Sequence, residues 1–202
     1  MEVQHSPAAT GARRHTRATM YGLAGHARHY ERCAGVLARP LYRRVVADVR
    51  AAALPAGAVV LDVGTGPGLV PEALVRACPD LSVVGIDLAP QMVARARERT
   101  RGTAGLRFEV ADVTGLPFPD ASMDLVVSSL SLHHWEHPDA GLADVVRVLR
   151  PGAEAWVYDG RGTLRRATAD ATGLPADVTQ ETLPGGLWLR PFGRLVLRRK
   201  AS

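Results

Sequence analysis

The sequence has little cysteine, one lysine and no long hydrophobic run. Its two cysteines, Cys33 and Cys78, form no CxxC pair or Cys/His cluster, which excludes a disulfide framework and a structural zinc site. The longest apolar runs, such as 58–61 and 125–127, are too short to cross a membrane. The polar segment 1–17 has no apolar core of the kind that a signal peptide needs. We therefore expect a reduced, cytoplasmic protein with no membrane partner and no bound metal.

Positive charge exceeds negative charge, with a formal net charge of +5, and Lys200 is the single lysine. A basic protein can bind nucleic acid, because neutralising phosphates supplies most of that affinity. Here the arginines are spread along the chain, and few aromatic residues lie among them to stack on bases. This distribution favours a solvated surface, and we do not expect a nucleic-acid partner.

Apolar segments of strand length alternate with segments of helical spacing. We predict strands over 59–63, 81–86, 106–110, 124–128 and 153–158, and helices over 69–77, 90–100 and 138–149. A further helix is predicted to open at Pro40, because proline is favoured in the first turn. Such alternation indicates an α/β fold, a Rossmann-like doubly wound sheet, mostly parallel, with helices on both faces.

The two ends of the chain are expected to differ from this middle part. Residues 1–20 are predicted to be a flexible arm, and 21–202 a single domain whose cofactor-binding core spans about 56–160. After a short helix over 164–172, the segments 178–183 and 187–197 read as two more strands, for about seven in all. The Pro-Gly-Gly segment 184–186 between them favours an antiparallel pair at one edge of the sheet.

Three glycines at alternate positions, Gly64, Gly66 and Gly68, follow the first predicted strand and its Asp62. Glycine accepts positive φ and has no Cβ, so a ligand can lie directly against the backbone. In open α/β sheets, ligands bind where this loop lies, at the carboxyl ends of the strands. A dinucleotide fingerprint would need a small residue at position 69, where Leu69 stands, and this disfavours a dehydrogenase.

The G-x-G-x-G spacing after an acid resembles motif I of the class I S-adenosylmethionine-dependent methyltransferases. Three further segments resemble the family in the same order: 85–87 with its acid Asp87, 111–113 with Asp112, and 123–130 followed by the turn at 149–152. The resemblance spans about 30–160 and is closest to the small-molecule methyltransferases of quinone and secondary metabolism. It implies S-adenosyl-L-methionine as the cofactor.

By this resemblance, the glycine loop would hold the methionine and ribose portion of the cofactor, the acid at 87 the ribose, and the residues at 112 and 113 the adenine. Two apolar residues after the second strand would sandwich the adenine ring, and two residues at the end of the fourth strand would line the sulfonium side. The implied cofactor-binding residues are Asp62, Gly64, Thr65, Gly66, Gly68, Asp87, Leu88, Met92, Asp112, Val113, Ser128 and Leu130. Asp112 can equally be a plain turn residue.

The acceptor and the catalytic residues are not identified by the sequence. Tyr30 stands where many relatives carry a tyrosine at the amino-acid end of the cofactor, and we expect the acceptor to enter beside Tyr30, Leu132 and Trp135. His133, His134 and His137 follow the fourth strand, and histidine titrates near neutral pH, so one of them could act as a general base. We favour the alternative, in which they pack under the following helix and cap it.

Two other functions remain open. An RNA-directed methyltransferase shares this fold, but those acting on exocyclic amines carry an Asn/Asp-Pro-Pro-Tyr segment after the fourth strand, where this chain has Ser128-Ser129-Leu130-Ser131. The second is an S-adenosylmethionine-binding protein without catalysis. Our prediction is transfer of a methyl group to an oxygen, nitrogen or carbon atom of a small molecule by in-line displacement.

Overall fold

The computed structural model describes residues 27–184 and 186–201, with side chains from Ala38 onward. The predicted flexible arm over 1–20 lies outside this range. Within it, no helix is both long and apolar enough to pass through a lipid bilayer.

The described residues form one seven-stranded sheet in the order β3-β2-β1-β4-β5-β7-β6. The first five strands in chain order run parallel to one another, and β7 pairs antiparallel with both β5 and β6. The strands are β1 (Val59–Val63), β2 (Ser82–Asp87), β3 (Leu106–Val110), β4 (Met123–Ser129), β5 (Leu149–Gly160), β6 (Ala176–Thr182) and β7 (Phe192–Arg199). This confirms the predicted Rossmann-like fold with an antiparallel C-terminal edge.

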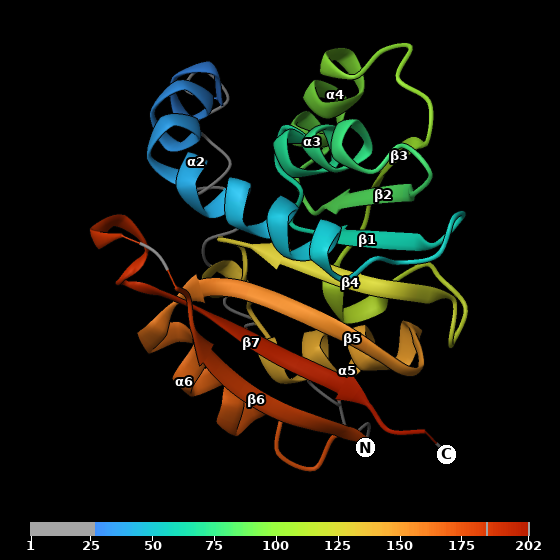
Figure 1. The fold of residues 1–202 in the computed structure, drawn as a ribbon, viewed down its shortest axis with the longest axis vertical. Coiled ribbons are helices and arrows are strands. Elements are labelled where there is room, and N and C mark those ends of the chain that lie inside the picture. The colour runs from blue at the N-terminus through green and yellow to red at the C-terminus, as the bar shows by residue number, and fades with distance from the viewer. Residues whose placement is uncertain (1–26, 185, 202) are drawn as a thin grey trace, which may run out of the picture.

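Helices cover both faces of the sheet (Figure 1). On one face lie α2 (Ala27–Ala51), α3 (Leu69–Ala77) and α4 (Pro90–Arg99), and on the other α5 (Pro138–Val148) and α6 (Arg161–Asp170). Because successive residues of a strand point to opposite faces of the sheet, they pack in two different hydrophobic cores. Val60 packs in the cluster that contains residues of α2 and α3, whereas Leu61 packs in the cluster with residues of α5 and α6.

The prediction that Pro40 opens a helix is wrong. Pro40 lies inside α2, which begins at Ala27. A proline inside a helix removes one backbone hydrogen bond. The helix nevertheless continues through it, and the following turns are anchored by Leu41, Val45 and Val49, all fully buried against the sheet. Burial of three such side chains outweighs the loss of one hydrogen bond.

The C-terminal pair also differs in detail from the prediction. Residues 187–189 form a short 3-10 helix, η4 (Leu187–Leu189), and the last strand starts only at Phe192. Pro191 directly before it has no amide to donate to a sheet. The connection between the strands is therefore a loop containing η4 in place of a tight hairpin, and β6 becomes the outermost strand.

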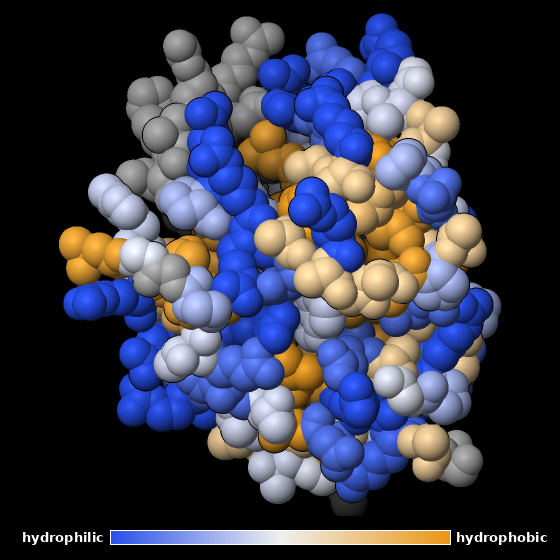
Figure 2. All heavy atoms as spheres, viewed as in Figure 1, coloured by the Kyte–Doolittle hydropathy of each residue, from blue (hydrophilic) through white to orange (hydrophobic). Residues whose placement is uncertain are grey.

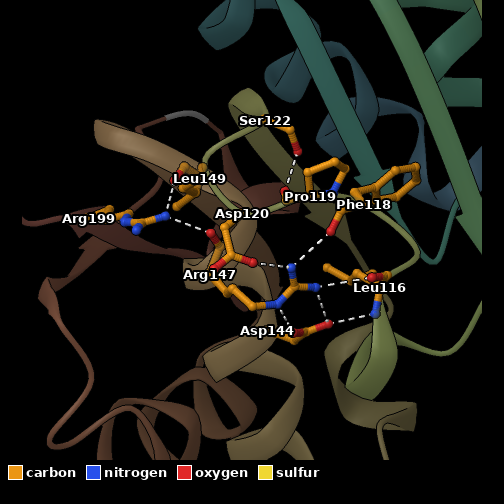
Figure 3. A network of polar contacts seen from close by, with 9 residues as sticks. All are labelled: Leu116, Phe118, Pro119, Asp120, Ser122, Asp144, Arg147, Leu149 and Arg199. Atoms are coloured by element: carbon orange, nitrogen blue, oxygen red, sulfur yellow. Dashed lines mark hydrogen bonds and ion pairs between the residues drawn. The ribbon is translucent and has the colours of Figure 1, made fainter.

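At the amino ends of β4 and β5, a polar network centred on Arg147 fixes the chain (Figure 3). The Arg147 guanidinium donates to the carbonyl oxygens of Leu116 and Phe118, at 3.0 and 2.8 Å, and to the carboxylates of Asp144 and Asp120. Burial raises the pKa of Asp144, but hydrogen bonds from Arg147 and from the Leu116 amide more than offset this and lower it overall. This end of the sheet is held by paired charges.

Candidate functional site

The glycine loop lies at the opposite end of the sheet, between β1 and α3. Gly64, Gly66 and Gly68 have φ values of +72°, +52° and +79°, in the left-handed region that other residues rarely adopt. A Cβ at Gly64 would lie 1.9 Å from the Ser131 hydroxyl oxygen, and one at Gly68 would lie 3.0 Å from the Ala96 Cβ. A Cβ at Gly66 would meet nothing within 4 Å. The loop is thus packed at both ends and open at its centre.

A cleft of about 370 Å³, including its open mouth, runs along this loop. It is lined by Tyr42 from α2, by residues 64–67 and 69–70, and by Ser129 and Leu130 at the end of β4. The residues that the sequence predicted at 64, 65, 66 and 130 therefore meet in one concave surface. Its position at the carboxyl ends of β1 and β4 is where open α/β sheets bind ligands.

Three buried polar atoms beside the cleft have no hydrogen-bond partner among the described residues: Asp62 Oδ1, Thr65 Oγ1 and Ser128 Oγ. Asp62 and Ser128 are each only 1% exposed, on the neighbouring strands β1 and β4. An unpaired buried polar group costs about 1–3 kcal/mol, and such groups are rare in native proteins. They are the groups that a polar ligand in this cleft would satisfy.

Asp62 is electrostatically unusual. Burial raises the pKa of its carboxyl to about 7, with a smaller lowering by the Thr65 hydroxyl and a further rise from the charge of Asp87. A cationic group placed next to Asp62 would favour the ionised form. The site can therefore bind a positively charged ligand group with release of a proton.

Asp87 ends β2 and is partly buried. Its Oδ2 accepts a hydrogen bond from the Gly66 amide at 2.8 Å, and its Oδ1 accepts one from the Ala89 amide at 2.9 Å. Burial raises the pKa of Asp87, and these two amides partly oppose the rise. The sequence pointed to Asp87 as a ligand for ribose hydroxyls. The structure adds that the same carboxylate holds the centre of the glycine loop.

Leu88, Met92, Asp112 and Val113, which the sequence also predicts for the site, follow the carboxyl ends of β2 and β3. Leu88 is 39% exposed and Met92 lies in the first turns of α4. Asp112 follows β3, and its Oδ1 accepts hydrogen bonds from the Thr114 amide and hydroxyl, so it caps the 3-10 helix η2 (Val113–Gly115). The turn role that the sequence left open for Asp112 is therefore present in the structure, and Val113 is largely buried.

The segment after β4 crosses the end of the sheet. Leu130 has a φ of +54°, which is strained for a residue other than glycine, and its amide donates to the Tyr158 carbonyl oxygen at 2.8 Å. The next residues form the 3-10 helix η3 (Leu132–His134). Ser131, just before it, contacts the loop at Gly64 and accepts a hydrogen bond from the Trp135 indole at 2.9 Å.

The described residues do not support the expected acceptor entrance, because neither Leu132 nor Trp135 lines the cleft. Leu132 is wrong as a pocket wall: it is 3% exposed and packs in the core with α5. Trp135 is partly buried, and a Cβ at Gly141 of α5 would lie 2.9 Å from its ring. The side chain of Tyr30 lies outside the described residues. An apolar residue after a strand can pack in the core or line a pocket, and the sequence pattern does not distinguish these two positions.

The three histidines differ from the favoured interpretation, because all three are exposed instead of packed under α5. His137 stands at the N-cap position of α5, yet its side chain makes no capping hydrogen bond. His133 instead pairs with Asp159 at the end of β5, with Nδ1 2.9 Å from the carboxylate Oδ2. We did not single out Asp159 from the sequence. The available signal was that a strand-end acid occurs in β5 as it does in β1 and β2.

The arginines form ion pairs on several elements. Arg76 and Arg99 both pair with Glu72, Arg150 with Asp124, and Arg198 with Glu154. Figure 2 shows hydrophilic side chains spread over much of the face that it draws. Much of the positive charge is thus balanced locally, in keeping with the solvated surface expected from the sequence.

Comparison with known proteins identifies relatives. A family model described as a methyltransferase domain matches residues 61–157. The chain is similar to the demethylmenaquinone methyltransferase of Deinococcus radiodurans, with 37% identity over 116 residues that cover 57% of this chain and 45% of that protein. It is also similar to the malonyl-[acyl-carrier protein] O-methyltransferase of Methylococcus capsulatus, with 33% identity over 150 residues, or 71% of this chain and 54% of that protein. The chain thus spans about half the length of these curated relatives.

The fold is shared with solved structures. A TehB-like SAM-dependent methyltransferase from Corynebacterium glutamicum superposes with a TM-score of 0.68 at 21% identity, and the match covers 87% of this chain and 99% of that one. The match includes the sheet that carries the glycine loop, so the cleft described above occupies a fold that these proteins have in common.

Proposed function

We propose that the chain is a class I S-adenosylmethionine-dependent methyltransferase, as its match to a methyltransferase domain and its similarity to named methyltransferases support, and that it transfers a methyl group from S-adenosylmethionine to a small-molecule acceptor. The observation that carries this proposal is the group of buried, unpaired polar atoms of Asp62, Thr65 and Ser128 beside an open glycine loop. The relatives named for demethylmenaquinone and malonyl-[acyl-carrier protein] support an acceptor outside nucleic acids. The low cysteine content supports a cytoplasmic location as part of the same proposal.

The residues present fit this cofactor. Its amino-acid end carries an ammonium group, which suits a buried carboxylate such as Asp62, and its ribose hydroxyls suit a strand-end carboxylate such as Asp87. Gly66, which has open space beside its Cα, allows the backbone to approach it, while Leu88 and Met92 offer apolar contact for a purine ring. We assign Thr65, Gly68, Asp112, Val113, Ser128 and Leu130 to the same site.

The cofactor supplies an activated methyl group on a positively charged sulfur. The chain then has two tasks: to align the acceptor with that group and to keep water away. The cleft walls from Tyr42, Val70 and Leu130 are suited to exclude water, because their side chains are largely apolar. No protein nucleophile is required for this reaction.

Methyl transfer with isotope-labelled cofactor tests the acceptor class. Total RNA and a small-molecule extract are offered side by side at physiological salt, and we expect label in the extract. Binding to RNA should be weak and should collapse as salt rises from about 50 to 200 mM. Label in RNA and none in the extract would replace this proposal with RNA methylation. Cofactor binding without label in either fraction would favour a binding protein without catalysis.

A further inference from the structure

His133 and Asp159 form a pair that neither the fold nor cofactor binding accounts for. Asp159 is 2% exposed, and its carboxylate is fixed by the Gly160 amide at 2.7 Å and the His133 amide at 3.3 Å. Its two oxygens lie 3.1 and 2.9 Å from His133 Nδ1. The imidazole itself remains 40% exposed. A buried, immobile carboxylate thus orients a ring that solvent or a ligand can reach.

This contact fixes which ring nitrogen is available. An ionised Asp159 accepts a hydrogen bond from Nδ1–H, so the neutral ring carries its lone pair on Nε2. Among the described residues, no hydrogen bond involves His133 Nε2. The neutral ring therefore has a basic nitrogen free, on the side of the ring opposite the hydrogen bond to Asp159.

The pair lies one strand beyond the cleft. In the sheet order, β4 separates β1 from β5, and Ser129 of β4 pairs with Tyr158 of β5. The cleft ends at Ser129 and Leu130, and His133 follows three residues later, held to the end of β5. Asp87 and the glycine loop occupy the ends of β2 and β1, so the pair lies on the side of the cleft away from the ribose-binding acid.

We propose that His133 is the general base for a hydroxyl acceptor and that Asp159 is its positioning residue, an inference that rests on the proposed methyl transfer. The acceptor oxygen forms a bond to the methyl carbon while the carbon–sulfur bond breaks, and that electron pair stays on sulfur. The hydroxyl proton passes to His133 Nε2 and then to water. Base assistance matters for such acceptors because a hydroxyl is poorly ionised at neutral pH.

The neighbouring charged groups distinguish His133 from His134. The centroids of the His133 and His134 rings lie 3.9 Å apart, and the ring planes are tilted by 49°. Burial, and then the charge of His133, lower the pKa of His134, while Asp159 and Asp87 oppose this. The charged groups that act on His134 are thus His133 on the same segment, Asp159 from β5 and Asp87 from β2. Within this set, His133 is the histidine hydrogen-bonded to a buried carboxylate.

The first test needs no acceptor. Nitrogen NMR of the ¹⁵N-labelled histidine rings in the full chain reports which nitrogen carries the proton. We expect Nδ1–H for His133 at a pH where the ring is neutral, and a shift toward Nε2–H in Asp159→Asn, because the new amide can donate to Nδ1. A wild-type His133 protonated at Nε2 would overturn the proposal, whatever the acceptor is.

The second test uses labelled methyl transfer into the small-molecule extract, with binding of S-adenosylhomocysteine measured in parallel. General bases typically contribute 10²–10⁴-fold, so His133→Ala should lose at least about 100-fold in transfer. Its affinity for the product should stay within about twofold, and added imidazole should restore part of the rate. His137→Ala, an exposed histidine four residues away, is the matched control and should keep wild-type transfer.

The outcomes separate the two proposals. His133→Ala that keeps transfer within about threefold of wild type would exclude a base role. Equal loss in His133→Ala and in His137→Ala would also exclude it, because the control lacks the Asp159 contact. Wild-type protein that binds the product but labels nothing in the extract would instead contradict the proposed function, and the proposal for His133 would fall with it.

Discussion

The two ends of the sheet differ in how completely their polar groups are paired. At the amino ends of β4 and β5, Arg147 satisfies carbonyl oxygens and carboxylates together (Figure 3). At the carboxyl ends of β1 and β4, Asp62 and Ser128 are buried with unpaired atoms, and the backbone adopts left-handed conformations at Gly64 and Leu130. At the proposed cofactor site, polar atoms are left unpaired and the backbone is strained, whereas the polar groups at the opposite end of the sheet are paired.

The largest loss of cofactor affinity is expected for a substitution at Gly64, where the glycine loop packs against Ser131. Gly64→Ala combines positive φ with a clash against Ser131, so we expect cofactor affinity to fall by at least about 100-fold. Gly57→Ala is the matched control, because Gly57 has φ +81° and open space around its Cα. It should lose about 1 kcal/mol of stability and no affinity. Calorimetry and urea unfolding measure both, and equal affinities in the two variants would contradict the comparison.

Loss of the Arg147 side chain should lower the stability of the fold at the amino ends of β4 and β5 and leave cofactor binding unchanged. Arg147→Ala leaves the Asp144 carboxylate with the Leu116 amide alone and removes the donor to two carbonyl oxygens, and we expect the free energy of unfolding to fall by about 2–3 kcal/mol. The dissociation constant for the cofactor should change less than twofold. A weakened cofactor complex, with stability unchanged, would show that the two ends are not independent.

Loss of the Asp87 carboxylate should weaken both cofactor binding and the stability of the glycine loop. Asp87→Ala is expected to weaken cofactor binding by about 1.5–3 kcal/mol, the usual size for charge-assisted hydrogen bonds. Because Asp87 also accepts from the Gly66 amide, the unfolding free energy should fall too, by about 1 kcal/mol. An unchanged dissociation constant in a folded variant would remove Asp87 from the site.

Asp62 should make both the stability of the fold and the affinity for the cofactor depend on pH. Its folded pKa of about 7 exceeds the usual unfolded value of about 4, so its contribution to stability is complete below pH 4. That contribution is lost as the pH rises through 7. Cofactor affinity should move the other way and increase over this window by at most about tenfold per pH unit, because the ammonium favours the ionised carboxyl. Asp62→Asn should flatten both profiles; an unaltered slope would assign the proton elsewhere.

The sequence predicted the fold and four of the nine residues that line the cleft, but not how the parts of the site interact. Strand and helix alternation followed from residue spacing, and Gly64 and Asp87 followed from short motifs near strand ends. The Pro40 prediction failed because burial of Leu41 and Val45 in tertiary contacts outweighs a local preference. Asp159 was missed because its partner His133 is 26 residues away, and such contacts leave no periodic signal.

Calorimetry with S-adenosylmethionine and its demethylated product tests the central claim most directly. The unpaired atoms of Asp62, Thr65 and Ser128 should gain partners on binding, and we expect a dissociation constant in the micromolar range, about −8 kcal/mol. Gly57→Ala should reproduce this value and Gly64→Ala should not. Heat of binding with NAD and none with either sulfur compound would contradict the account.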